Sequence, residues 1–186
     1  MSEFGDFGLS EATQAALVGL GPGRPTPFQN ETIPALLSNR DLFAQVPAGS
    51  GEDVAIAFTA IERVTRDGPT YNPTALILAP SRELVIQLHE TIYQLAARGT
   101  SASVLGVYEG KPVTSQIGPL KHGVDIVVGT PGRVLEHVKR KTLRIEQLKV
   151  LVLDLADEML HQGRSGDIES IIGGTPKTRQ TVLLSA

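Results

Sequence analysis

The chain has 186 residues, of which 41% are hydrophobic and 20% charged, and this composition predicts one globular domain with its own core. It contains no cysteine, which excludes disulfides and thiolate metal sites, and none of its apolar runs approaches the ~20 residues of a membrane span. The net charge of −3 argues against a strong overall attraction to nucleic acid. We therefore expect a cytoplasmic protein without membrane contact, in which any nucleic-acid contact is local.

Short apolar runs alternate with longer amphipathic stretches, and this alternation predicts an α/β fold with a mainly parallel sheet. Several of the runs are apolar throughout, as expected for strands that are buried on both faces. The expected helices begin with two between residues 10 and 37, joined by the turn-forming segment 21–25. The expected strands are 42–46, 75–79, 103–108, 125–128, 150–153 and 181–184. The later expected helices are 54–64, 82–97, 132–139 and 168–172.

In open parallel sheets, ligands bind outside the carboxyl ends of the strands. The segments that directly follow the expected strands should therefore lie along one edge and form the functional site. These segments are 47–53, 80–83, 129–133, 154–157 and 185–186.

These segments, with an aromatic residue and a glutamine upstream, resemble the ordered motifs of the DEAD-box RNA helicases. Phe4 and segment 25–29, which ends in Gln29, resemble the Q motif that reads adenine. The other matches are 48–53 with the phosphate-binding loop, 79–84 with motif Ia, 130–133 with motif Ib, 152–160 with the DEAD box and 183–186 with motif III.

The resemblance implies a three-layer, RecA-like P-loop fold in which helices flank the sheet. Residues 1–186 would form a single RecA-like domain, with a Q-motif helical region at 1–40 and the core at 41–186. The chain stops at Ala186, inside an expected strand end, so a second RecA-like domain is expected downstream.

The phosphate-binding loop departs from the family pattern at its most important positions. The family loop ends in lysine and threonine, which neutralise the β and γ phosphates and hold magnesium, whereas this chain has Glu52 and Asp53. At an effective dielectric near 20, a charge pair ~4 Å apart is worth roughly 4 kcal/mol, so the reversal changes the interaction by up to about 8 kcal/mol. Micromolar binding amounts to only about 8 kcal/mol. ATP and magnesium, which the resemblance implies, are therefore expected to bind weakly or not at all.

Two readings of this acidic pair are open. Glu52 and Asp53 fall in the first turn of a helix, where free N–H groups and the helix dipole favour an anion, so they could occupy the field of a phosphate. Alternatively, they are ordinary first-turn acids that point into water. Any residual nucleotide contact would come from Phe4, Gln29 and the loop residues Gly49, Ser50 and Gly51, although Gln29 is better suited to fixing a turn.

The DEAD box itself lacks its glutamate. Leu155 stands at that position and can neither accept a proton nor orient the attacking water. By resemblance, Asp154 would keep a residual metal contact, and Asp157 would hydrogen-bond with Ser185 of motif III. The alternative for Asp154 is that it merely ends a strand.

The RNA-facing motifs are better preserved. Ser81 is expected to cap the helix that starts at Arg82, and Thr130 to cap one that starts at Pro131. Helix starts with an arginine suit backbone phosphates, although two capped helices need no ligand. Glu109 stands where relatives have glycine, and the basic run 139–141 could extend the RNA edge. The expected RNA-binding residues are Pro80, Ser81, Arg82, Gly110, Thr130, Pro131, Gly132 and Arg133.

Three functions follow from these patterns. The first is a helicase-like domain without ATPase activity that binds RNA or a protein partner and works with a second RecA-like domain. The second is a working ATP-dependent RNA helicase with unusual phosphate-loop and DEAD-box motifs. The third is a pure protein scaffold. The sequence favours the first, because both the phosphate anchor and the catalytic carboxylate are replaced.

Overall fold

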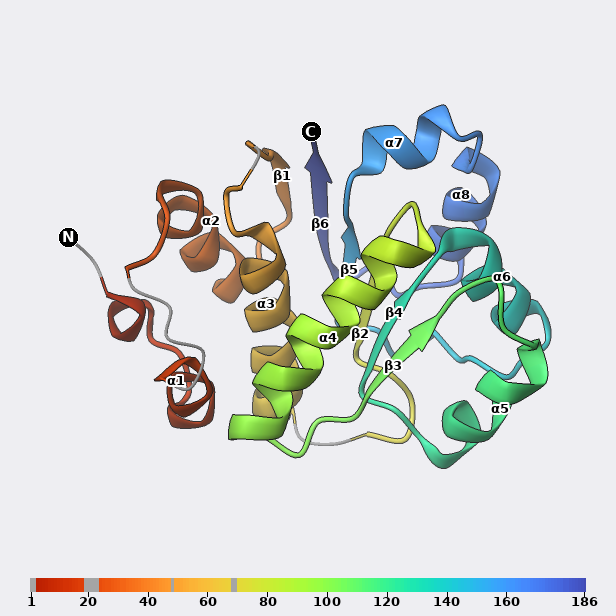
Figure 1. Ribbon diagram of the computed structural model, residues 1–186. Coiled ribbons are helices and arrows are strands. Elements are labelled where there is room, and N and C mark those ends of the chain that lie inside the picture. Colours follow the sequence, from red (N-terminus) through yellow and green to blue (C-terminus); the bar gives the residue numbers. More distant parts are fainter. Residues whose placement is uncertain (1–2, 19–23, 48, 68–69) are drawn as a thin grey trace.

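The computed structural model describes residues 3–18, 24–47, 49–67 and 70–186 (Figure 1). A six-stranded sheet lies at its centre, with the strand order β1-β6-β5-β2-β4-β3, and every neighbouring pair is parallel. The strands are β1 (Leu42–Gln45), β2 (Ala75–Leu78), β3 (Val104–Val107), β4 (Ile126–Gly129), β5 (Val150–Leu153) and β6 (Gln180–Ser185).

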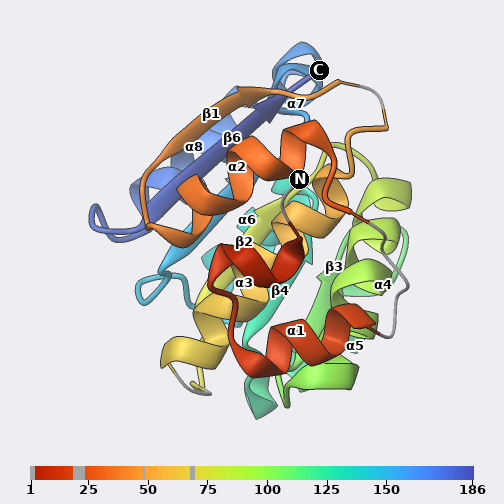
Figure 2. The same ribbon diagram turned by 90° about the vertical axis from the view of Figure 1, so that its left-hand side faces the viewer.

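Helices cover both faces of the sheet. On one face, the buried side chains of α1 to α4 pack against alternate strand residues such as Ile77 and Val152, and Figure 2 shows these helices in front of the sheet. On the other face, α5 to α8 pack against the intervening residues, such as Leu76 and Leu151. The helical elements are η1 (Phe4–Phe7), α1 (Glu11–Val18), α2 (Pro27–Leu37), α3 (Glu52–Asp67), α4 (Arg82–Gly99), α5 (Val113–His122), α6 (Pro131–Lys139), α7 (Ala156–His161) and α8 (Ser165–Gly173).

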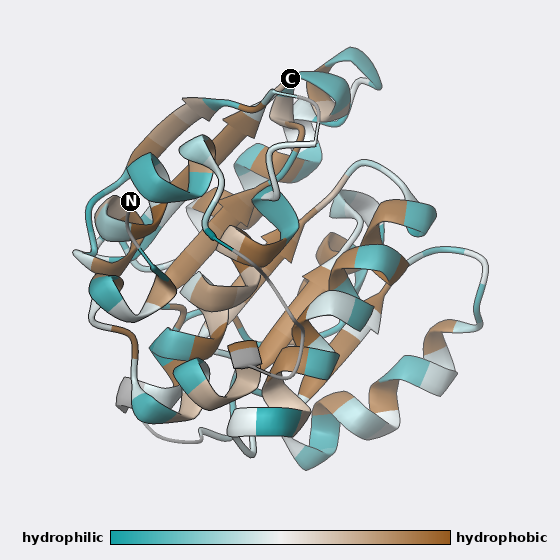
Figure 3. Cartoon of the chain, turned by 60° about the vertical axis from the view of Figure 1, so that its left-hand side comes forward, coloured by the Kyte–Doolittle hydropathy of each residue, from teal (hydrophilic) through white to brown (hydrophobic). Residues whose placement is uncertain are grey.

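Burial follows this three-layer arrangement. The strands β2, β4 and β5 are buried at every residue, whereas the edge strand β1 alternates between half-buried and exposed side chains. Figure 3 shows the hydrophobic strands in the centre, with hydrophilic residues on the outward surfaces of the helices. The α/β fold with a parallel sheet between helices, expected from the sequence, is confirmed.

All six expected strands are present, with small shifts in their ends, and so are the expected helices. The expected joining turn at 21–25 lies partly outside the described residues. The sequence did not predict η1, α5 or α7. Two of these are short, and α5 contains Gly118 and Pro119, residues that lower helix propensity and hide the helical pattern. Among the described residues, no helix is both long and apolar enough to cross a membrane.

The domain assignment stays a prediction. The helical region that precedes β1 comprises η1, α1 and α2, which corresponds to the expected region 1–40. A second RecA-like domain beyond Ala186 also remains an expectation.

Candidate functional site

The segments that follow the strands meet at one edge of the sheet, as the sequence predicted. Backbone hydrogen bonds continue the pairing just past the strands: the Val46 amide donates to the Ser185 carbonyl (2.7 Å), and the Asp154 amide donates to the Leu78 carbonyl (2.9 Å). The Ala79 amide likewise donates to the Gly129 carbonyl (3.0 Å). This carboxyl edge therefore brings together the phosphate-loop segment, motifs Ia and Ib, the DEAD-box segment and motif III.

The phosphate-loop segment is held by side chains from the start of α2. The Thr26 hydroxyl donates to the Ser50 carbonyl (2.5 Å), and the Gln29 amide Nε2 donates to the Gly51 carbonyl (2.8 Å). The Gln29 Oε1 in turn accepts from the Thr26 amide (3.0 Å), so both ends of this side-chain amide are engaged. Gly51 has a φ of 77°, and a Cβ there would overlap Gln29 Nε2. Gln29 thus fixes the turn, and Thr26 is a loop-holding residue that the sequence reasoning missed.

Phe4 lies in the core. It is 8% exposed, and its ring meets those of Phe7 and Phe58 edge-to-face, with centroids 6.1 and 5.7 Å apart. Since Phe58 belongs to α3, this contact fixes η1 against the helix that follows the phosphate loop. The expected adenine contact of Phe4 is not tested by this packing, but the ring already has an apolar environment.

The two acids in the first turn of α3 are half-buried and hydrogen-bonded to neighbouring side chains. The Ser50 hydroxyl donates to Glu52 Oε2 (2.6 Å), and the Gln87 amide of α4 donates to Asp53 Oδ2 (2.6 Å). Burial raises the pKa of Asp53, an effect that the Gln87 hydrogen bond opposes and the nearby charge of Glu52 increases. These acids therefore do not simply point into water.

Asp154, at the end of β5, has the most strongly raised pKa among the acids of this edge. It is 3% exposed, and its Oδ1 has no hydrogen-bond partner among the described residues. Burial, followed by the charges of Asp53 and Glu52, raises the pKa of Asp154 to about 7. Within the described ranges, no group of three or more histidine, aspartate and glutamate side chains has the geometry to hold a metal ion. Burial and the two nearby acids thus all disfavour the ionised form of Asp154.

Leu155, directly after Asp154, adopts a left-handed backbone conformation (φ 48°, ψ 52°) at the start of α7. The acid that follows in this helix, Asp157, accepts a hydrogen bond from the Ala186 amide (3.1 Å). This amide, and to a lesser extent the Ser185 hydroxyl, lowers the pKa of Asp157. The hydrogen bond from Ala186 joins α7 to the residue that follows β6, whereas the Ser185 hydroxyl donates to the Ala186 carbonyl (3.5 Å), so the expected hydrogen bond between Asp157 and Ser185 stays a prediction.

Motif Ia and the loop after β3 meet around one buried tyrosine. Ser81 caps α4 as predicted, since its hydroxyl accepts a hydrogen bond from the Leu84 amide (3.3 Å). The exposed Arg82 guanidinium lies 5.5 Å from the centroid of the Tyr108 ring, and Lys111 Nζ lies 5.2 Å from it. Gly110, with a φ of 94°, lets Arg82 approach, because a Cβ there would be 2.9 Å from Nη1. Two exposed cations thus lie close to the same ring at the carboxyl edge.

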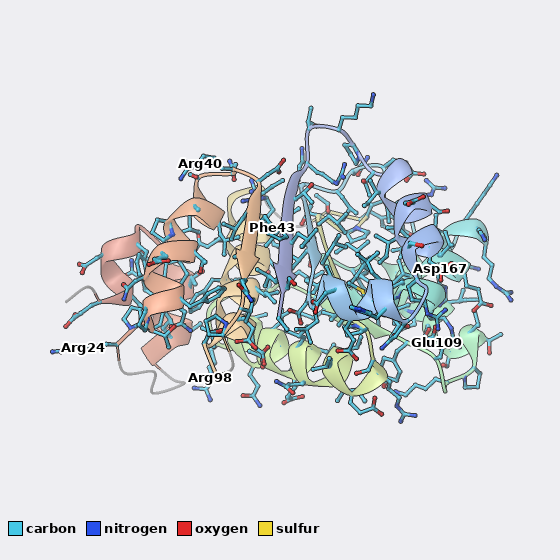
Figure 4. The ribbon with its side chains drawn as sticks, turned by 90° about the horizontal axis from the view of Figure 1, so that it is seen from above. Arg24, Arg40, Phe43, Arg98, Glu109 and Asp167 are labelled. Carbon is cyan, nitrogen blue, oxygen red and sulfur yellow. The ribbon has the colours of Figure 1, made fainter. Side chains whose placement is uncertain are left out.

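The predicted cap of α6 by Thr130 is wrong. The Thr130 hydroxyl donates instead to the carboxylate of Glu109, and its side chain makes no cap hydrogen bond. A Cβ on Gly132 would lie 2.9 Å from Glu109 Oε1 and 3.7 Å from Asp167 Oδ2, so both acids flank the start of α6, and Figure 4 shows them at the same end of the molecule. The threonine hydroxyl is thus oriented as a donor toward the carboxylate, and its oxygen accepts no hydrogen bond from the first amides of α6.

Arg133 is built into the protein interior. It is only 8% exposed. Its Nη1 donates to the Lys111 carbonyl (2.9 Å) and to Gln116 Oε1 (3.1 Å). Its Nε lies 3.2 Å from Glu136 Oε2. The same Gln116 oxygen contacts Nε2 of the buried His137 (3.0 Å). Arg133 therefore supports the loop that carries Lys111, whereas the sequence had assigned its charge to RNA. Of the remaining expected RNA contacts, Pro80, Thr130 and Pro131 are buried.

The basic run 139–141 lies away from the motif Ib segment. It stands at the end of α6, which starts at the carboxyl edge. A helix of this length spans about 13 Å, so its basic end is displaced from the motif Ib segment by that distance. That the run extends the RNA edge stays a prediction.

Known proteins resemble this chain over its whole length. The family model of the DEAD/DEAH box helicases matches residues 26–186. The "ATP-dependent RNA helicase CshA" of Listeria monocytogenes is 42% identical over 186 residues, which is 100% of this chain and 35% of that protein. The "DEAD-box ATP-dependent RNA helicase CshA" of Bacillus subtilis is 40% identical over 183 residues, or 98% of this chain and 36% of that protein.

A solved structure agrees with these sequence matches. The crystal structure of a DEAD box protein from the hyperthermophile Methanococcus jannaschii superposes with a TM-score of 0.91 at 36% identity, covering 99% of this chain and 50% of that one. This chain thus spans about a third of the length of the two CshA relatives and half of the solved chain. The order of the motifs, the parallel sheet and these matches together show that the chain belongs to the DEAD/DEAH box helicase family.

Proposed function

We propose that the chain is an RNA-binding helicase domain that has lost ATP binding and hydrolysis and that works with a second RecA-like domain. The observation that carries this proposal is the group of three acids at the phosphate-loop end of the sheet. Burial, and after it the charges of Asp53 and Glu52, raise the pKa of Asp154 to about 7, so a further negative charge at this place is disfavoured. A site that already disfavours its own negative charges also disfavours a triphosphate.

The residues of this edge do not fit a magnesium nucleotide. In the family, lysine and threonine face the phosphates at the end of the loop, whereas Glu52 and Asp53 occupy those positions here. The Ser50 hydroxyl donates to Glu52, and both the oxygen and the nitrogen of the Gln29 amide form hydrogen bonds with the protein backbone. These polar groups therefore already have partners within the protein. An uncompensated phosphate would meet carboxylates at this place, which costs several kcal/mol at the effective dielectric of a protein surface.

Hydrolysis lacks its base as well. Leu155 replaces the glutamate that positions water in relatives, and an aliphatic side chain accepts no proton. The replacements at the phosphate-binding positions (Glu52 and Asp53) and at the water-positioning residue (Leu155) are independent, and each argues against ATPase activity.

Binding to the RNA backbone is supported by the other half of the edge. Arg82 and Lys111 are exposed and adjacent around Tyr108, and the capped start of α4 lies beside them. Such contacts read phosphates without base sequence. The acid at the start of α6, Glu109, weakens this surface, so we expect modest affinity for a single domain.

The names of the relatives favour a second candidate, an active ATP-dependent RNA helicase. The CshA proteins that are about 40% identical to this chain bear that description. For this chain to share the activity, Glu52 and Asp53 would have to turn away from the phosphates or recruit a cation.

Two titrations decide between the candidates. The chain is titrated calorimetrically with ATP and with ADP in the presence of magnesium, and by fluorescence anisotropy with labelled single-stranded RNA. We expect no nucleotide heat at high micromolar concentration, and RNA binding that weakens in Arg82→Gln. Clear heat with ATP, or phosphate release that RNA stimulates, would establish the second candidate instead.

A further inference from the structure

A concavity of about 250 Å³ lies at the amino edge of the sheet, opposite the phosphate loop. It is formed by segment 71–73 before β2, residues 120, 121 and 124 between α5 and β4, and segment 141–144 after α6. In Figure 1, the end of α5 and the chain entering β2 lie on the side away from the C-terminal end of β6. We call this concavity the amino-edge pocket. Neither the family motifs nor the proposed function uses it.

The amino-edge pocket is lined by three cations and no acid. Lys121, Lys141 and Arg144 are all exposed, and within the described residues none of them has an ion-pair partner. Other cations of the chain differ in this respect: Arg140 pairs with Glu136, and Arg164 pairs with Asp167. A local positive field attracts an anion to this pocket although the chain has a net charge of −3.

An exposed but fixed aromatic ring stands at the rim. Tyr71 is 65% exposed, yet its hydroxyl donates a hydrogen bond to the Lys121 carbonyl. Its ring packs against the turn before β4, where a Cβ on Gly123 (φ 94°) would be 3.4 Å from Tyr71 Cδ2. An aromatic face that is held in place and open to solvent beside cations suits a nucleobase, because stacking tolerates every base.

The backbone at Lys141 supports a role for this lysine. Lys141 follows the end of α6 in a left-handed conformation with φ 57°, and its amide donates to the Val138 carbonyl (2.9 Å). Glycine or asparagine normally occupies such a position after a helix, because other side chains are disfavoured there. The lysine side chain is exposed, so core packing does not explain its presence.

We propose that the amino-edge pocket binds one phosphorylated nucleotide unit, with the three cations around the phosphate and the base stacked on Tyr71. The unit can belong to a single-stranded RNA or to a free nucleotide, since both present the same base and phosphate. At about 250 Å³ the pocket is small, so it would hold a single nucleotide unit rather than several. The proposal is independent of the ATPase and RNA-binding proposals above, because those concern the opposite edge.

The test follows backbone amides of the pocket by two-dimensional NMR on the isotope-labelled chain. The probes are uridine monophosphate, a short oligouridine and inorganic phosphate, and the reporters are Gly123, Lys141 and Thr142. We expect both nucleotide probes to shift these amides, with phosphate at least about fivefold weaker because it cannot stack. Tighter binding of oligouridine assigns RNA as the source, and equal binding assigns the free nucleotide. No shift at these amides, or phosphate binding as tightly as the nucleotide, overturns the proposal.

Two variants separate binding from folding. Lys141→Gly relieves the left-handed strain, so we expect equal or higher thermal stability together with about threefold to fivefold weaker nucleotide binding. Tyr71→Leu should weaken the nucleotide probes by at least about fivefold and leave phosphate unchanged. Arg98→Gln removes an exposed charge at the end of α4, a helix end that packs on α1, and serves as the matched control (Figure 4).

The outcomes at the two edges can be told apart. Arg82→Gln weakens RNA contacts only at the carboxyl edge, so the amide shifts of the amino-edge pocket should persist in that variant. If Lys141→Gly and Tyr71→Leu both bind uridine monophosphate as the unaltered chain does, the amino-edge pocket is not the site, whatever happens at the carboxyl edge.

Discussion

The Thr130 hydroxyl donates its hydrogen bond to the carboxylate of Glu109, which places a negative charge at the start of α6. In a helicase domain this helix start is suited to a backbone phosphate, because its free N–H groups and dipole favour an anion. If the chain binds RNA as proposed, Glu109 competes with a backbone phosphate for the start of α6. The acid comes from the loop after β3, twenty-one residues earlier in the chain.

Removing this charge should strengthen RNA binding. In Glu109→Gln the side chain keeps its size, but the helix start loses the nearer of its two flanking acids. We expect about threefold to tenfold tighter binding of single-stranded RNA at low salt, in line with the value of one charge near a helix terminus. Fluorescence anisotropy measures the affinity, and Glu169→Gln, an exposed acid on α8, is the control. Equal affinity of Glu109→Gln and the unaltered chain would show that Glu109 does not oppose RNA.

Asp154 should make the protein less stable as the pH rises. Its pKa in the folded chain is about 7, against 3.8 for an ordinary aspartate carboxyl group, so ionisation between these values favours the unfolded state. Asp154→Asn should leave stability nearly unchanged at pH 4 and raise it progressively up to pH 8, by at most about 4 kcal/mol. Urea unfolding of both proteins across this range measures the difference.

Asp157 is the matched control for this pH dependence, because its pKa is shifted in the opposite direction. The Ala186 amide stabilises the ionised form, so Asp157→Asn should lose stability above the pKa of the unfolded carboxyl group. A gain for Asp154→Asn that is as large at pH 4 as at pH 8 would contradict the role of ionisation.

Restoring the family residues in the phosphate loop should restore nucleotide binding. Glu52→Lys with Asp53→Thr replaces the two acids beside Asp154 by a cation and a hydroxyl, reversing a repulsion of several kcal/mol. We expect ATP affinity to rise from undetectable to the micromolar range in a calorimetric titration. Glu52→Gln with Asp53→Asn removes the repulsion without adding a cation and should give an intermediate result. Hydrolysis should still need Leu155→Glu, and phosphate release by the double variant alone would contradict that requirement.

Gly51 should not tolerate a side chain. An alanine would adopt an unfavourable positive φ, and its Cβ would overlap Gln29 Nε2, so we expect Gly51→Ala to lower the free energy of unfolding by about 2 kcal/mol. Gly166→Ala in α8 is the control, because apart from its own helix and chain neighbours no atom lies within 4 Å of its Cβ position. That variant should gain roughly 0.5–1 kcal/mol from helix propensity. A loss at Gly166 that equals the loss at Gly51 would show that the Gln29 contact is unimportant.

The sequence by itself determined the layers of the fold. Apolar runs of four to six residues separated by amphipathic stretches allow only strands that are buried between helices, and all six strands lie where these runs are. The cap at Ser81 was also predictable, since a hydroxyl three residues before an amide bonds locally. The same holds for the gathering of the motif segments, because parallel strands bring their carboxyl ends to one edge.

Only the tertiary structure decided how the charged residues are used. The sequence predicted Thr130 as a helix cap and Arg133 as a phosphate contact. In the structure, Thr130 donates its hydroxyl hydrogen bond to Glu109, and Arg133 donates to Gln116. Both acceptors come from segments that are distant in the sequence. The raised pKa of Asp154 likewise depends on burial and on acids that lie about a hundred residues earlier in the chain. Periodicity and local motifs report contacts within a few residues, whereas electrostatic interactions depend on distances that only the folded chain defines.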